Sequence, residues 1–294
     1  MGLFFSSDRF TRPGPGVRPD APRKKGVARL AEIMGRDMWN FFRAGFLAFL
    51  GCLPFIIGMF FAVETHALLF MLLAGIIGGL IAGPELSAMA DTVLRSLRDE
   101  PGYWWETYRR VWKRNARESL VPGMLTGLVL SMQIFTLFHM SVISAGIVTW
   151  VLLILSFVVT LGLESYIWPQ IALLNLPLYG ILKNSLLLFL GYLPRSLGAI
   201  AIKAVYWGAI LLFFPLTTII LPFTNFWLPM LPALLCIYQP LNKCFTIEST
   251  INKMREDELN AALAKDNEPL PEDPTEKAEE STEASSHDSS SDIQ

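Results

Sequence analysis

The chain alternates between long apolar segments and short segments that hold most of its charges. A helix needs about 20 mostly apolar residues to cross a bilayer core about 30 Å thick. The segments that meet this requirement cover residues 39–63, 67–88, 120–139, 145–168, 198–222 and 226–246. The pattern therefore predicts an all-α, polytopic membrane protein with six transmembrane helices.

A further apolar segment, residues 184–194, lies between Lys183 and Arg195 and is too short to cross a bilayer. We interpret it as an interfacial or cytoplasm-facing helix. Polar or amphipathic segments at 29–38, 103–119 and 181–197 precede successive pairs of spans. We therefore expect three successive hairpins, each preceded by an amphipathic segment on the cytoplasmic side.

The 24 Lys and Arg residues fall on one side of the predicted spans. They lie before Trp39 (eight), at Arg43 (one), in 89–119 (seven), in 183–203 (three) and after Pro240 (five). The connections at the opposite ends of the spans, around 64–66, 139–145 and 224–225, contain none. By the positive-inside rule both termini are cytoplasmic, and an even number of crossings agrees with this orientation.

Composition supports a membrane protein and divides the chain into three parts. Hydrophobic residues make up 52% of the chain, charged residues 17%, and the mean hydropathy is +0.43, which leaves too few charges to cover a water-soluble domain. We expect a basic cytoplasmic segment at 1–38 and a six-span membrane domain at 39–255. Residues 256–294 are acidic and then Ser-rich, which predicts a disordered cytoplasmic tail.

The segment 103–119 combines aromatic and basic residues. A helix here places Trp105, Tyr108, Trp112 and Asn115 on one face and Arg109, Lys113 and Arg117 on another. This arrangement is typical of a helix at the headgroup layer, where rings anchor and cations meet anionic lipid headgroups. We do not expect a nucleic-acid partner, because apolar spans tether the segment at both ends; docking of a cytoplasmic protein stays open.

Four charged residues lie inside or at the ends of the spans: Arg43, Glu85, Glu164 and Lys203. Counted at 1.5 Å per residue from the outer turns, all four reach a depth of about 30–33 Å, at the inner boundary of the membrane. The structural interpretation, which we favour, is that they snorkel or pair, Arg43 with Glu85 in particular. The functional alternative is the polar floor of an inward-facing cavity that binds a solute or a proton.

Other intramembrane residues suggest helix packing. Gly75, Gly79 and Gly83 form a flat stripe that we expect to pack against the first span. Pro84 is expected to kink or end the second span, and Pro215 and Pro222 to break helices near the last outer turn. We interpret Gln133 as an interhelical hydrogen-bonding residue and His139 as part of an outer loop.

Enzyme motifs are missing from the sequence. It contains no HExxH, GxSxG, P-loop or GxGxxG motif, and its histidines, His66, His139 and His287, are far apart along the chain. We therefore expect no catalytic residue, no metal site, no cofactor and a protein that is not an enzyme.

An ordered series of short motifs over residues 1–255 resembles the YesL-like family of bacterial membrane proteins, also called domain of unknown function 624. The motifs are MGLFF at 1–5, RPGPGV at 12–17, WNFF at 39–42 with LP at 53–54, GPE at 83–85, LRDE at 97–100, WKRN at 112–115 and NKCF at 242–245. The resemblance implies a multi-pass protein of the cell (plasma) membrane with an accessory or permease-like role in oligosaccharide uptake. It also implies ABC-type sugar uptake components as partners. The alternatives are a stand-alone secondary transporter of a small solute and a structural or assembly protein of the membrane.

Overall fold

The computed structural model describes residues 23–266 except 101, 143–145 and 175. The first part of the predicted basic segment, most of the predicted tail and His287 lie outside these residues. The regular elements of the described chain are all helices, and no strand occurs among the described residues. Its elements are α2 (Gly26–Thr65), α3 (Leu68–Leu73), η1 (Ala74–Gly78), α4 (Gly79–Arg98), α5 (Trp104–Phe138), α6 (Ile147–Leu173), α7 (Leu178–Gly191), α8 (Leu193–Leu212), η2 (Leu216–Thr218), α9 (Leu221–Thr224), α10 (Trp227–Phe245) and α11 (Ile247–Asp266).

Six helical segments of the described chain are long and apolar enough to cross a membrane. They are Gly26–Thr65, Leu68–Arg98, Trp104–Phe138, Ile147–Leu173, Leu193–Leu212 and Leu221–Phe245. The predicted number of spans is therefore confirmed. The short apolar segment before Arg195 forms part of α7, which has 14 residues and is too short to cross.

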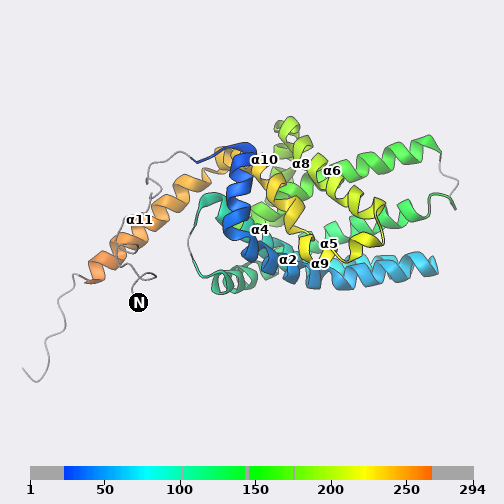
Figure 1. Cartoon of the computed structure of the whole chain (residues 1–294), viewed down its shortest axis with the longest axis horizontal. Coiled ribbons are helices and arrows are strands. Elements are labelled where there is room, and N and C mark those ends of the chain that lie inside the picture. The colour runs from blue at the N-terminus through cyan, green and yellow to red at the C-terminus, as the bar shows by residue number, and fades with distance from the viewer. Residues whose placement is uncertain (1–22, 101, 143–145, 175, 267–294) are drawn as a thin grey trace, which may run out of the picture. The chain divides into compact units, whose positions relative to one another are not determined.

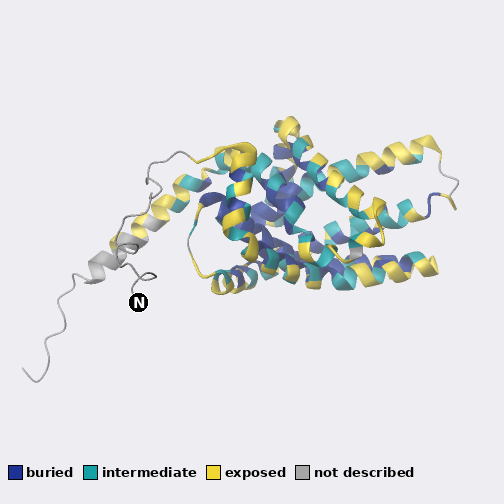
Figure 2. Ribbon diagram, in the orientation of Figure 1, coloured by how far each residue is buried: buried dark blue, intermediate teal, exposed yellow. Residues whose placement is uncertain are grey.

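The chain divides into two units, Met1–Phe245 and Thr246–Gln294. The first unit contains the described helices α2 to α10, and α4 lies at its centre, in contact with α2, α5, α6 and α10 (Figure 1). Most side chains of α4 are buried, whereas exposed apolar side chains cover much of the outer surface of the unit (Figure 2). A surface of this kind is expected where lipid is the solvent.

The structure has longer helices than the predicted spans. Residues 29–38 continue without a break into the first span as part of α2, and residues 104–119 continue into the third as part of α5. At 1.5 Å per residue α2 is about 60 Å long, about twice the thickness of a bilayer core. The first two amphipathic segments are thus extensions of the spans, because the sequence places no helix breaker between each segment and its span. The third, 181–197, is divided between α7 and the start of α8.

The prolines differ in whether they end a helix. Pro84 lies inside α4, which continues to Arg98 and ends where Asp99 takes a left-handed conformation. The fifth span, by contrast, ends at Leu212 and not at residue 222, and the following residues form only the short elements η2 and α9. Pro215 and Pro222 account for this early end, because proline cannot donate the backbone hydrogen bond that a helix interior requires.

The second unit contains α11, which continues past the predicted start of the disordered tail at Glu256 to Asp266. The sequence ELNAALAK, residues 258–265, consists mainly of strong helix formers, which explains the difference.

Candidate functional site

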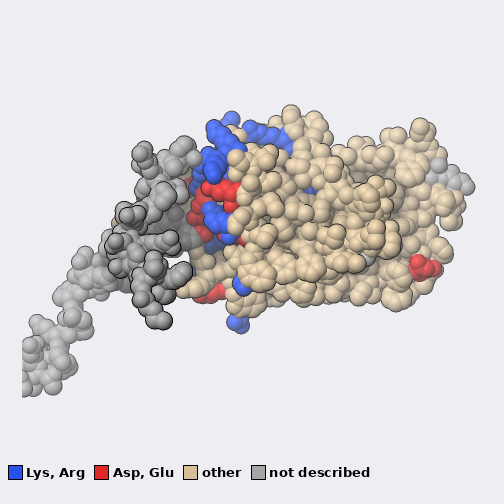
Figure 3. All heavy atoms as spheres, viewed as in Figure 1, with Lys and Arg blue, Asp and Glu red and all other residues tan. Residues whose placement is uncertain are grey.

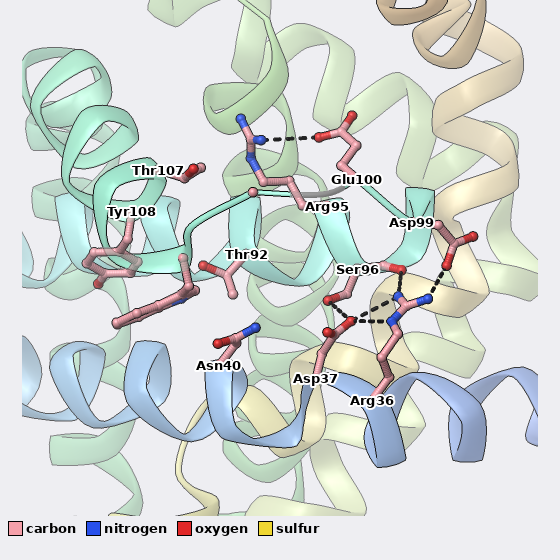
Figure 4. Close-up of a pocket in the computed structure, with 12 residues that line it drawn as sticks. Arg36, Asp37, Asn40, Thr92, Arg95, Ser96, Asp99, Glu100, Thr107 and Tyr108 are labelled. Carbon is pink, nitrogen blue, oxygen red and sulfur yellow. Dashed lines mark hydrogen bonds and ion pairs between the residues drawn. The ribbon is translucent and has the colours of Figure 1, made fainter. Parts of the chain in front are cut away.

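A cavity of about 290 Å³ opens between α2, α4, the link after α4 and the start of α5 (Figure 4). It is lined by Arg36, Asp37, Asn40, Thr92, Arg95, Ser96, Asp99, Glu100, Gly102, Trp104, Thr107 and Tyr108. We call it the α2–α5 pocket. It lies at the end of the first unit where charged side chains gather on the face shown in Figure 3, while most of that face carries no charge.

Asp99 holds the N-terminal end of α2 against the C-terminal end of α4. Its carboxylate accepts hydrogen bonds from the guanidinium groups of Arg29, at 2.6 Å, and of Arg36. Arg23 Nε lies 3.1 Å from the same carboxylate. Arg29 and Arg36 also donate to the main-chain oxygens of Leu97 and Ser96, at 3.0 and 2.8 Å. These donors satisfy carbonyls at the end of α4 that have no partner within the helix.

Burial by itself would raise the pKa of Asp99, but the hydrogen bonds from Arg36 and Arg29 and the charges of these two residues outweigh it and lower the pKa. Asp99 is therefore ionised at neutral pH and fixes two cations at the rim of the pocket.

Two further contacts order the polar walls. Asp37 on α2 accepts a hydrogen bond from Ser96 Oγ on α4 at 2.6 Å and one from Arg36 Nε at 2.9 Å. Arg95 contacts Asp91 at 2.7 Å and Glu100 at 3.4 Å. Its guanidinium thus connects α4, which carries Asp91, to the link that follows α4. Figure 4 shows the contacts of Asp37 with Ser96 and Arg36 and the contact of Arg95 with Glu100 as dashed lines.

The opposite wall is aromatic. Trp104 and Tyr108 are one turn apart on α5, with ring centroids separated by 5.2 Å. The indole nitrogen of Trp104 is buried and has no hydrogen-bond acceptor among the described residues. A buried donor without a partner costs about 1–3 kcal/mol, and a ligand that supplies an acceptor would recover this energy.

Glu85 lies behind this aromatic wall, inside the span formed by Leu68–Arg98. Tyr108 Oη donates to Glu85 Oε2 at 2.5 Å, and Trp112 Nε1 donates to Glu85 Oε1 at 2.9 Å. The side chain packs on the backbone of α2, where a Cβ added at Gly51 would lie 2.6 Å from Glu85 Cγ. Tyr108 therefore contacts both the pocket and an intramembrane carboxylate.

The predicted pair between Arg43 and Glu85 is wrong. Arg43 is exposed, and its guanidinium carbon lies 4.9 Å from the ring centroid of Trp39 and 5.6 Å from that of Trp104. Equal depth in the membrane is not sufficient for two charges to pair. Arg43 contacts Trp39 and Trp104, whereas Glu85 contacts Tyr108 and Trp112. The other two members of the predicted charge layer do meet: Lys203 Nζ lies 3.8 Å from Glu164 Oε2.

The predicted anchor residues of α5 separate into two groups. Tyr108 and Trp112 turn towards Glu85, and Asn115 is buried and donates to Ser87 Oγ at 3.3 Å, so this face packs on α4 and is not a free anchoring surface. The cause is the position of α4, whose polar side chains satisfy the phenol, the indole and the amide. The other predicted anchor residues are exposed: Trp105, Arg109, Lys113 and Arg117.

The glycine stripe packs on α5, and the prediction that it packs on the first span is wrong. A Cβ atom added at Gly79 would clash with the Gly123 carbonyl oxygen, and one added at Gly83 would lie 2.5 Å from the Ser119 carbonyl oxygen. Gly75 similarly faces Ser131 and the backbone of α5. Gly78, outside the stripe, faces Phe55 of α2 instead. The π-helical residues Ala74–Gly78 shift the helix register here, which a regular 3.6-residue period does not anticipate.

The end of the unit opposite the α2–α5 pocket brings together two histidines that are 73 residues apart in the sequence. His66 Nδ1 and His139 Nε2 are 2.7 Å apart, and His139 Nδ1 lies 2.7 Å from the Phe135 carbonyl oxygen. Gln133 Nε2 donates to Ser156 Oγ at 2.5 Å and to Thr160 Oγ1 at 2.8 Å, which confirms its interhelical role.

Sequence reasoning did not identify the α2–α5 pocket. Its residues come from the predicted basic segment and from the end of the second span with the link that follows it, where the positions of Lys and Arg were used only to predict orientation. The mixture of acids and bases on both sides of the first hairpin was the available signal, since opposite charges at matching depths can pair.

The chain matches no protein-family model, no curated protein and no solved structure. The resemblance to the YesL-like family therefore stays a prediction, and a functional proposal rests on the residues of the α2–α5 pocket.

Proposed function

We propose that the chain is a non-enzymatic integral membrane protein, permease-like or accessory to carbohydrate uptake, that binds a small saccharide in the α2–α5 pocket. The observation that carries this proposal is the buried indole N–H of Trp104 without an acceptor among the described residues, in a pocket of mixed polar and aromatic walls.

The chemistry of the lining supports a hydroxyl-rich ligand. Saccharide hydroxyls both donate and accept hydrogen bonds, so they can meet the carboxylates of Asp37 and Glu100 as well as the amide of Asn40. The C–H faces of a sugar ring can pack on Trp104 and Tyr108. A volume of about 290 Å³ is at the lower end of the range for small-molecule sites, which favours a monosaccharide or one unit of an oligosaccharide.

The pocket end is proposed to face the cytoplasm of a bacterial cell, with both termini on that side and the spans arranged as three hairpins in the plasma membrane. The exposed cations Arg109, Lys113 and Arg117 repeat every fourth residue on α5 and suit anionic lipid headgroups at that face. The same surface of α5 is where ABC-type sugar uptake components would dock.

The test compares two neighbouring tryptophans. Trp104 lines the pocket, whereas Trp105 is 57% exposed and does not. We expect the full chain in nanodiscs to bind one or more of a panel of mono- and disaccharides in calorimetric titration. Trp104→Phe should weaken that binding about tenfold, the equivalent of roughly one hydrogen bond, and Trp105→Phe should leave it unchanged.

The proposal is overturned if no saccharide binds, or if the two substitutions weaken binding equally. A protein that binds saccharide and moves it into liposomes without an ATPase would be the stand-alone transporter, whereas copurification with an ATPase and no independent uptake would show the accessory role.

A further inference from the structure

Glu85 lies inside a membrane span and does not line the α2–α5 pocket, so saccharide binding does not explain why a carboxylate is present there. An intramembrane acid is costly and is usually retained for a function. No ion pair joins Glu85 to a Lys or Arg among the residues that the structure describes. Its two oxygens each accept one hydrogen bond from an uncharged donor, Tyr108 and Trp112.

The surroundings of Glu85 contain little positive charge. Tyr108 and Trp112 of α5 donate to it, and Cys52 of α2 lies within electrostatic range of both Glu85 and Glu164 of α6. Lys203 contacts Glu164, and Arg43 of α2 lies over the indoles of Trp39 and Trp104. Lys243, in the last turn of α10, makes no ion pair with Glu85 within the described chain. A carboxylate with uncharged donors and no cation can change between its ionised and protonated forms without breaking an ion pair.

Tyr108 connects this carboxylate to the pocket. Its ring lines the α2–α5 pocket and lies against Trp104, while its hydroxyl donates to Glu85. A ligand that packs on the ring and displaces it, or restricts its motion, changes how strongly or how often the hydroxyl donates to Glu85. Protonation of Glu85 in turn weakens that hydrogen bond, because an ionised acceptor binds a donor more strongly than a neutral one.

We propose that Glu85 is a proton-binding site whose protonation is coupled, through Tyr108, to the occupancy of the α2–α5 pocket. The inference deepens the proposed function, since it makes the solute-binding pocket proton-linked. By reciprocity, a ligand that favours one protonation state of Glu85 binds more tightly at the pH where that state prevails.

The experiment fills the pocket without requiring its natural ligand. In a chain with Cys52→Ala, Cys236→Ala and Cys244→Ser, a Thr107→Cys substitution places a thiol on the pocket wall for a bulky thiol reagent. Infrared difference spectra in nanodiscs then follow the carbonyl stretch of protonated carboxyl groups between roughly pH 4 and 9.

We expect a carboxyl band that titrates in the parent chain and is absent after Glu85→Gln. The control is Glu118→Gln, which changes an exposed acid on α5 and should leave the band in place. Labelling at position 107 should move the midpoint of this band by about one pH unit, a tenfold change in proton affinity. After Tyr108→Phe the band should remain, and its midpoint should no longer respond to the label.

The proposal is wrong if Glu85→Gln removes no titrating band, or if labelling leaves the midpoint in place. A midpoint that still responds after Tyr108→Phe would overturn the coupling through that residue. Trp112→Phe keeps the charge and removes the donor to Oε1, so it provides a second test should Glu85→Gln fail to fold: an unaltered midpoint would contradict the assignment. Because the label replaces the ligand, these outcomes are independent of whether a saccharide binds.

Discussion

At the residue scale, Asp99 determines how α2 and α4 are joined. It receives hydrogen bonds from two arginines of α2, although about a third of its side chain is exposed. Its neighbour Glu100 is more buried and accepts a two-point contact from Arg98 at 2.7 and 3.1 Å. The two consecutive acids thus bind different arginines: Asp99 binds Arg29 and Arg36, and Glu100 binds Arg98. These contacts order the link next to the pocket.

Asp99→Asn should lower the stability of the full chain at neutral pH by roughly 1 kcal/mol, a value reduced by solvent screening of this partly exposed group. The pKa of Asp99 is lowered in the folded state, so its stabilising effect is complete above the unfolded pKa, near 4, and is lost as the pH falls through the folded pKa. Melting temperatures of the two proteins in detergent should therefore converge on acidification.

The matched control is Glu64→Gln, which changes an exposed acid at the C-terminal end of α2. It should leave the melting temperature unchanged at every pH. A constant difference between wild type and Asp99→Asn down to acidic pH would contradict the assigned ion pairs.

At the element scale, the contact between α4 and α5 sets the position of the pocket walls. Gly79 and Gly123 approach so closely that a Cβ on either would clash with the other's carbonyl oxygen. Close backbone approach maximises dispersion contact and is a common basis of helix association in membranes. It also brings Tyr108, which lies on the same α5, within reach of Glu85.

Gly79→Ala should destabilise the protein by about 1–3 kcal/mol, because the added methyl group meets main-chain atoms that cannot rotate away. Thermal unfolding in detergent would measure the loss. Gly198→Ala on α8 is the matched control, since its Cβ would meet nothing within 4 Å, and it should be neutral or slightly stabilising. Equal stability of the two variants would show that α4 and α5 do not pack through this stripe.

At the scale of the whole chain, the separation of charges predicts the orientation in the membrane. Thr65, Val142 and Leu216 are exposed at connections that contain no Lys or Arg, and Arg110 is exposed on the basic half of α5. Asn225 is unsuitable as a probe, because it is fully buried and its Oδ1 accepts the backbone N–H of Phe226 at 2.6 Å.

Single cysteines at 65, 142 and 216, in a chain without native cysteines, should react in intact cells with a membrane-impermeant thiol reagent. A cysteine at position 110 should react only after the membrane is opened. Labelling of position 110 in intact cells would contradict the cytoplasmic placement of the pocket.

The number of the spans and their approximate positions followed from the sequence alone. A run of 20 apolar residues has one stable conformation in lipid, the helix, because every backbone polar group must find a partner within the segment. The interhelical role of Gln133 was predictable for the same reason: an amide in an apolar span needs a nearby hydrogen-bonding partner.

The tertiary structure decided which residues meet. Depth along a helix can be counted from the sequence, but rotation about its axis depends on the neighbours, and the π-helical turn at Ala74–Gly78 changes that rotation. Arg43 and Glu85 therefore have matching depths and different partners. The α2–α5 pocket arises where packing brings residues 36–40 of α2 against the continuous stretch 92–108. No local pattern specifies that juxtaposition, because side-chain contacts between distant segments are set by the shape of the whole bundle.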